Sequence, residues 1–100
     1  MSAYLISDVK AKDSAAFDIY RSRATASIEQ YGGRYLARGG ASQIIMGCWA
    51  PQAIVIIEFD TAEQAKAWYE SPEYAGAMML REQAFNGDLI LVDGVADDSD

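Results

Sequence analysis

The chain has 100 residues, the size of one domain, and its 51% hydrophobic residues supply the apolar surface that a folded core needs. The formal net charge of −7 leaves no basic face for a nucleic acid and disfavours adsorption to an anionic membrane. Because no apolar run approaches the roughly 20 residues of a membrane-spanning helix, we expect neither a nucleic acid nor a membrane as a partner.

The sequence contains no histidine and one cysteine, Cys48. The lack of histidine excludes Ser-His-Asp and Cys-His arrangements, histidine-ligated haem and most zinc and non-haem iron sites, so we expect no metal and no other cofactor. A lone cysteine cannot form an internal disulfide, and residues 1–4 lack the basic flank and apolar stretch of a signal peptide. These features indicate a cytoplasmic protein. Because no histidine is present to activate Cys48, we expect it to be a buried structural thiol and not a nucleophile.

The first predicted elements are a strand and a helix. Residues 3–9 form a short apolar run with β-branched and aromatic members, which predicts a strand. Asp13 stands at an N-cap position, and apolar residues then recur every three or four positions, which predicts a helix that ends at Gly32 and Gly33. The apolar stripe of this helix consists of Phe17, Tyr20, Ala24, Ile28 and Tyr31.

Two alternating segments follow, residues 34–38 and 42–48, with a Gly-Gly pair between them. One long kinked strand and two short strands both agree with this pattern. Residues 53–59 come next and are apolar on both faces for most of their length, which is typical of a strand in the middle of a sheet.

The second half of the chain carries two helix-start signals. Thr61 and Gln64 form a capping-box pattern, which predicts a helix to about Tyr69. Ser71, followed by a proline at the first helical position, predicts a second helix. An Asn-Gly pair at 86–87 predicts the end of that helix.

Residues 88–95 are the last predicted strand, and the acidic residues 97–100 predict a disordered tail after one domain that spans 1–96. The order is βαββαβ, that of a ferredoxin-like α+β sandwich with an antiparallel sheet and its helices on one face. The other sheet face is then uncovered, and pairing of two copies through identical surfaces is the commonest way to cover one. We therefore expect a homodimer.

Three motifs carry a resemblance to a known family: residues 31–40 (YGGRYLARGG), 58–59 (EF) and 67–74 (AWYESPEY). Together with a compatible opening at 3–6 and with Arg81, they make the chain resemble, over nearly its whole length, the family called domain of unknown function 1330. The resemblance implies a dimeric α+β barrel, in which two ferredoxin-like protomers face their sheets together. That superfamily includes cofactor-independent oxygenases, muconolactone isomerases, haem enzymes and ligand-binding modules of transcriptional regulators, so it implies no single activity.

Arg34 and Arg38 are the first candidate ligand-binding residues. They are four positions apart on a predicted strand, so we expect them to point to one face and flank one patch, although the sequence leaves open which face. Two guanidinium groups can hold a carboxylate through forked donors, and Arg81 is expected to add a third. The alternative is that these arginines form ion pairs, with Glu58 for example or with an acid of the partner subunit, and that Arg81 packs its stem on the helix.

Tyr20 and Trp68 are the other candidate pocket residues, because each lies on a helix face that is expected to look toward the sheet. Their rings suit a small aromatic ligand, while packing in the core explains most aromatic residues of the chain. Asp8 is a candidate proton acceptor if it is buried, with a surface carboxylate as the ordinary alternative. The amides after Ser71 and Pro72 suit an anion, but capping by Ser71 explains this pattern.

These residues support two classes of function. The first is a small-molecule enzyme that acts on a small carboxylate or aromatic acid without a cofactor, by proton transfer, isomerisation or oxygenase-like chemistry. The second is a non-catalytic module that binds a small acidic metabolite, or a dimer whose role is structural. The lack of histidine weakens the first class without excluding it, because tyrosine, aspartate and ordered water also move protons.

Overall fold

The structure, a computed structural model, describes residues 1–95, and the predicted tail at 97–100 lies outside this range. Within it, strands and helices follow each other in the predicted order. The strands are β1 (Ala3–Ala11), β2 (Arg34–Arg38), β3 (Ile54–Phe59) and β4 (Phe85–Asp93). The helices are α1 (Ser14–Gln30), α2 (Ala62–Tyr69), α3 (Pro72–Met78) and α4 (Arg81–Ala84).

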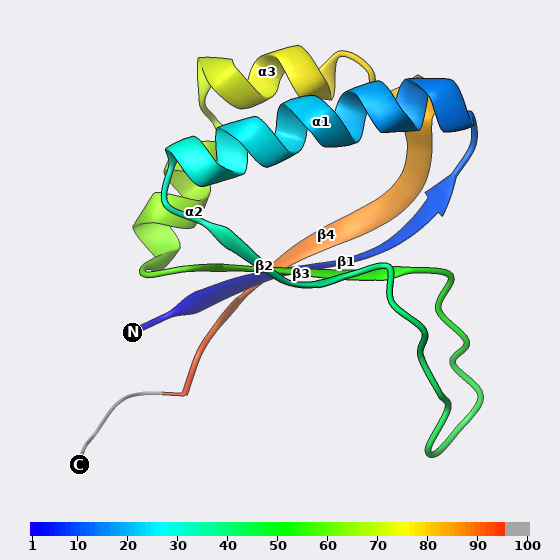
Figure 1. Cartoon of the computed structure of the whole chain (residues 1–100). Coiled ribbons are helices and arrows are strands. Elements are labelled where there is room, and N and C mark those ends of the chain that lie inside the picture. Colours follow the sequence, from blue (N-terminus) through cyan, green and yellow to red (C-terminus); the bar gives the residue numbers. More distant parts are fainter. Residues whose placement is uncertain (96–100) are drawn as a thin grey trace.

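The strands form one antiparallel sheet in the order β2-β3-β1-β4, and the helices lie on one of its faces (Figure 1). This is the ferredoxin-like α+β fold. β3 pairs with both β1 and β2 and so lies inside the sheet, which confirms the prediction from its two apolar faces. Among residues 1–95, no helix is both long enough and apolar enough to cross a membrane.

The core lies between the inner face of the sheet and the helices. Leu5 of β1 and Phe59 of β3 belong to one buried cluster with Ile28 of α1 and Trp68 of α2. The indole Nε1 of Trp68 donates a hydrogen bond to Ser27 Oγ over 2.9 Å, so the polar edge of this buried ring is satisfied. The apolar stripes found in the sequence are therefore what holds the helices on the sheet.

The predicted helix-start signals are present, but the Gln64 side chain has a different hydrogen-bond partner from the one predicted. Asp13 and Ser71 accept hydrogen bonds from backbone amides at the starts of α1 and α3. Thr61 Oγ1 accepts from the Gln64 amide over 3.1 Å, which is one half of the predicted capping box. The Gln64 side chain does not return to Thr61; its Nε2 donates to the Tyr31 carbonyl oxygen over 2.6 Å and ties the end of α1 to the start of α2.

Three predictions of local structure are wrong. Segment 42–48 is not a strand but part of an exposed excursion between β2 and β3, since no strand within residues 1–95 pairs with it. Cys48 lies in this excursion and is exposed, not buried. The Asn-Gly pair at 86–87 lies inside β4 and does not end a helix, because β1 continues to Ala11 and pairs there with Phe85.

Gly33 stands where two elements approach too closely for a side chain. A Cβ atom at this position would lie 2.6 Å from Phe59 Cζ and 2.9 Å from Ile28 Cγ2, and both of these side chains are fully buried. We expect Gly33→Ala to lower the free energy of unfolding by about 1–3 kcal/mol, because neither neighbour has room to move aside. Urea denaturation measures the change. Gly40→Ala is the control, since nothing lies within 4 Å of a Cβ there, and equal losses in the two variants would contradict this account.

The outer face of the sheet, opposite the helices, is uncovered in the protomer. Ile56, Ile6 and Ile90 stand side by side across β3, β1 and β4. Ile90 is 56% exposed, and Val92, which follows on the same face of β4, is 40% exposed. The structure thus has the apolar outer face that the order of elements predicts.

Candidate functional site

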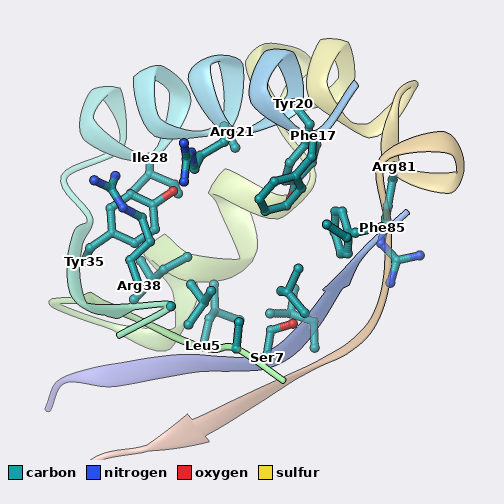
Figure 2. A pocket seen from close by; sticks show the side chains of 18 of the residues that line it. Leu5, Ser7, Phe17, Tyr20, Arg21, Ile28, Tyr35, Arg38, Arg81 and Phe85 are labelled. Atoms are coloured by element: carbon teal, nitrogen blue, oxygen red, sulfur yellow. The ribbon is translucent and has the colours of Figure 1, made fainter. Parts of the chain in front are cut away.

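A cavity of about 420 Å³ lies between the inner face of the sheet and the helices (Figure 2). Its volume is within the range of small-molecule sites in proteins. The walls are mainly apolar and come from all four strands, from α1 and from the helices that follow β3. Their aromatic part consists of Phe17, Tyr20, Tyr35, Trp68, Tyr74 and Phe85.

The charged side chains of the cavity lining are of one sign. Within residues 1–95 they are Lys10, Arg21, Arg38 and Arg81, and no aspartate or glutamate is among them. These are four of the chain's eight lysines and arginines, in a protein that has fifteen acidic residues. The fold therefore gathers positive charge at a partly enclosed, apolar cavity, an arrangement that attracts a small anion.

The structure brings together four of the five candidate ligand-binding residues. Tyr20 comes from α1, Arg38 from the end of β2, Trp68 from α2 and Arg81 from α4, and all four line the cavity. Arg34 does not line it.

The prediction that Arg34 and Arg38 point to the same face is wrong because β2 contains a β-bulge. The register of β2 on β3 shifts at Leu36, so Arg34 lies opposite Glu58 on the outer face and Arg38 lies opposite Val55 on the inner face. Arg34 Nη2 is 2.8 Å from Glu58 Oε1. Arg34 therefore forms an ion pair within the protein, which is the alternative given above, whereas Arg38 stays a candidate for binding a ligand.

The arginines of the cavity differ in how far their donors are already used. Arg81 Nη2 donates to the Gly87 carbonyl oxygen over 2.6 Å. Arg21 Nη2 is 3.6 Å from Oδ1 of Asp18, an aspartate of the same helix. Arg38 makes no ion pair within the described part of the chain. Its guanidinium lies 4.7 Å from the centre of the Tyr35 ring, and Figure 2 shows both side chains on the same side of the cavity as Arg21.

Tyr20 and Tyr74 form a hydroxyl pair in the cavity wall, with 2.7 Å between their oxygen atoms. Burial raises the pKa of both hydroxyls, and the pKa of Tyr20 is raised further by its neighbour Tyr74. Both groups are therefore neutral near pH 7 and serve as hydrogen-bond donors and acceptors, not as bases. The Trp68 ring centre is 4.2 Å from that of Tyr74, and because its N–H is bound to Ser27, Trp68 supplies only an apolar wall.

Sequence reasoning missed Lys10, Arg21 and Tyr35 as residues of the cavity. Arg21 follows Phe17 by four positions, so its place on the same helix face was visible in the spacing. Regular alternation along the strand would put Tyr35 on the face opposite Arg38, and only the bulge puts both on one face. No signal in the sequence marks the bulge, because no glycine lies within β2.

Asp8 and Ser71 have structural roles. Asp8 Oδ1 accepts hydrogen bonds from the backbone amides of Gln52 and Ala53, over 2.9 and 3.1 Å, and the residue does not line the cavity. Ser71 Oγ accepts from the Tyr74 amide over 3.1 Å, which is the capping role given as the alternative. Neither residue contributes to the cavity chemistry.

Several solved structures are similar to this chain. A protein of unknown function from Rhodopseudomonas palustris has a TM-score of 0.76 and 16% identity, covering 95% of this chain and 83% of its own. A cofactor-independent oxygenase from Streptomyces nogalater has a TM-score of 0.65 and 9% identity, covering 99% and 98%. A dimeric protein of unknown function from Bacteroides fragilis, with a ferredoxin-like fold, has a TM-score of 0.60 and 14% identity, covering 93% and 96%. At these identities the likeness shows a shared fold.

The sequence comparisons give one family. No curated protein sequence matches the chain. The profile of the family described as domain of unknown function (DUF1330) matches residues 2–95, which is nearly the whole chain and includes the three motifs noted above. The chain therefore belongs to the DUF1330 family.

Proposed function

We propose that this protein binds a small organic anion, a carboxylate on an aromatic or other apolar body, in the cavity between the sheet and the helices. The observation that carries the proposal is the lining: within residues 1–95 each charged side chain at the cavity is basic, although the protein's net charge is −7. A carboxylate gains most from such groups where water is partly excluded. The aromatic wall offers the apolar body a complementary surface.

Arg38 is the proposed carboxylate-binding residue. Its forked donors are not taken by an acidic side chain in the described chain, and its contact with the Tyr35 ring restrains the plane of the guanidinium. Arg21 adds a second positive charge to the same cavity. With the carboxylate on Arg38, the body of the ligand would lie toward the hydroxyl pair of Tyr20 and Tyr74.

The same cavity offers groups for cofactor-independent catalysis. A neutral tyrosine hydroxyl, from Tyr20 or Tyr74, can donate a hydrogen bond to a carbonyl oxygen or to an oxyanion that develops on it. A non-catalytic binding role is the second candidate. It is favoured by the lining itself, in which no carboxylate within residues 1–95 is placed to act as a base.

We also propose that two copies pair through their outer sheet faces, as the predicted homodimer requires. Pairing would bury the row formed by Ile56, Ile6 and Ile90, which is costly to leave in water. The dimeric protein from Bacteroides fragilis with this fold supports the proposal.

A cytoplasmic location is proposed as well, since a reducing compartment keeps an exposed thiol such as Cys48 free.

Pairs of ligands that differ only in charge test the binding proposal. We expect benzoate and phenylacetate to raise the melting temperature of the protein by about 5 °C at ligand concentrations about tenfold above Kd. The uncharged benzamide and phenylacetamide should raise it far less, because only the acids interact with the cationic lining. Scanning fluorimetry measures the shifts. Equal effects of acids and amides, or no effect of either, would refute the proposal, and mass spectrometry of the bound acid after incubation distinguishes turnover from simple binding.

A further inference from the structure

The excursion between β2 and β3, residues 39–53, lines the cavity only at its two ends, with Gly39, Gln52 and Ala53, so the binding proposal leaves the rest of it unexplained; we call this excursion the arm. It contains no charged residue, in a chain of which 23% of the residues are charged. Four of its large apolar side chains are exposed: Ile44 at 53%, Ile45 at 88%, Met46 at 91% and Trp49 at 68%. A stretch of this composition is expected to be covered by another surface, because so much apolar area in water is unfavourable.

The two ends of the arm are fixed to the sheet. The Gly39 amide donates to the Ile54 carbonyl oxygen over 2.9 Å, and the Val9 amide donates to the Ala53 carbonyl oxygen over 2.8 Å. The Asp8 carboxylate accepts from the Ala53 amide as well. These bonds set the direction in which the arm leaves the sheet. Figure 1 shows that it runs away from the helices, past the opposite side of the sheet.

We propose that the arm packs against a second copy of this chain, so that each protomer of the homodimer holds the other with its arm. The inference rests on the dimer proposed above and adds a second contact to it. The arm projects on the side of the apolar outer face, where a partner paired through that face would lie. Each leg of the arm, about six residues long, can span about 20 Å when extended, whereas packed sheets are about 10 Å apart. The arm is therefore long enough to reach beyond the partner's sheet and along its side.

The charge of the arm favours a second copy over a lipid surface. Two copies that each carry a net charge of −7 repel one another. An uncharged segment can pack against the second copy with less electrostatic repulsion than a charged segment would meet. A segment that inserts into an anionic bilayer normally carries lysine or arginine beside its apolar residues, and residues 39–53 carry neither. We therefore assign the arm to the dimer and treat insertion into lipid as an outcome that the test must exclude.

Two residues of the wild-type arm report its environment directly. Trp49 is exposed in the protomer, whereas the second tryptophan, Trp68, is 2% exposed there, so a change in quenching by acrylamide reports Trp49. Cys48 is the chain's one cysteine and is exposed in the protomer, so its rate of reaction with a thiol reagent reports the same arm. Sedimentation velocity of the same samples gives the fraction of dimer.

The experiment compares the full wild-type chain, as a dimer, with its diluted monomer and with Ile90→Glu, which carries a charge on the outer face. We expect dimer formation to slow the reaction of Cys48 at least tenfold and to protect Trp49 from acrylamide. The double variant Ile45→Ser, Met46→Ser should weaken the dimer by about 10–100-fold in Kd. Ile19→Ser, at an exposed position of α1, should leave it unchanged.

The possible outcomes distinguish the proposed contact of the arm from the proposed pairing of the sheet faces. A dimer in which Cys48 and Trp49 react as they do in the monomer would overturn the arm contact and leave the pairing of sheet faces intact. A chain that stays monomeric at every concentration would overturn both. A blue shift of Trp49 emission on mixing the dimer with phosphatidylcholine vesicles would overturn the assignment of the arm to a second copy. Ligand binding in the cavity is measured in a separate experiment, so none of these three outcomes bears on the binding proposal.

Discussion

Replacing Arg38 with methionine is expected to weaken the binding of benzoate and related acids by about 10–100-fold, because a charge-assisted contact to a carboxylate contributes about 1.5–3 kcal/mol. Methionine keeps an unbranched stem of similar reach, so it removes the charge and the forked donors while it largely retains the packing against Tyr35. Isothermal titration calorimetry gives the two dissociation constants. The melting temperature without ligand should change little, since Arg38 makes no ion pair within residues 1–95.

Arg34→Met is the matched control, because it removes the same side chain from the same strand on the other face of the sheet. We expect its affinity for the acids to equal that of the wild type, since Arg34 lies away from the cavity and pairs with Glu58. Its effect on stability should stay below about 1 kcal/mol, because the Arg34 side chain is half exposed. Equal losses of affinity in both variants would mean that overall charge, and not the position of Arg38, governs binding.

Replacing Ile90 with glutamate is expected to convert the proposed dimer to a monomer across the micromolar range. Ile90 ends the row of three isoleucines on the outer face, and in a sheet-to-sheet dimer a carboxylate there would be buried without a partner charge. The two-fold symmetry doubles the effect, because each interface then contains two such charges. Sedimentation equilibrium of wild type and variant measures the shift in dissociation constant, which we expect to exceed a factor of about 1000 for a cost of about 4 kcal/mol or more.

Ile19→Glu provides the control for this second experiment. Ile19 is 48% exposed, comparable with Ile90 at 56%, but it lies on α1 and so on the other side of the molecule. We expect this variant to dimerise like the wild type. A dimer that tolerates glutamate at position 90 would show that the copies meet through another surface.

Much of the fold could be predicted from the sequence, because its signals are local. The cap at Asp13, the cap at Ser71 and the stripe that contains Ile28 each depend on residues within a few positions, and each is present in the structure. The position of β3 inside the sheet also followed from its own composition. The end of the last helix was misplaced because the start of β4 is set by a distant partner, the end of β1, and no local pattern reports such a pairing.

The candidate site could be predicted in its residue types but not in its geometry. Tyr20 and Trp68 were found because helical spacing decides which face they take. The assignment of Arg34 and Arg38 failed because the side of a strand residue depends on register, which one extra residue reverses. Cys48 was assigned to the interior because no histidine is present to activate it, but that argument concerns its reactivity and does not report whether another surface covers the arm.

The bulge at Leu36 has a consequence for how relatives of this protein diverge. Deleting this one residue would remove the bulge and pair β2 regularly with β3, and Arg38 would stay opposite Val55 on the inner face. A β2 of unchanged length that lacked the bulge would instead carry Arg38 to the face that holds Arg34, and the cavity would lose its proposed carboxylate-binding residue although no arginine had been replaced. In a relative, the face taken by the second arginine therefore depends on both its spacing from the first and the presence of the bulge, so an alignment that shows both arginines does not by itself show that the second one faces the cavity.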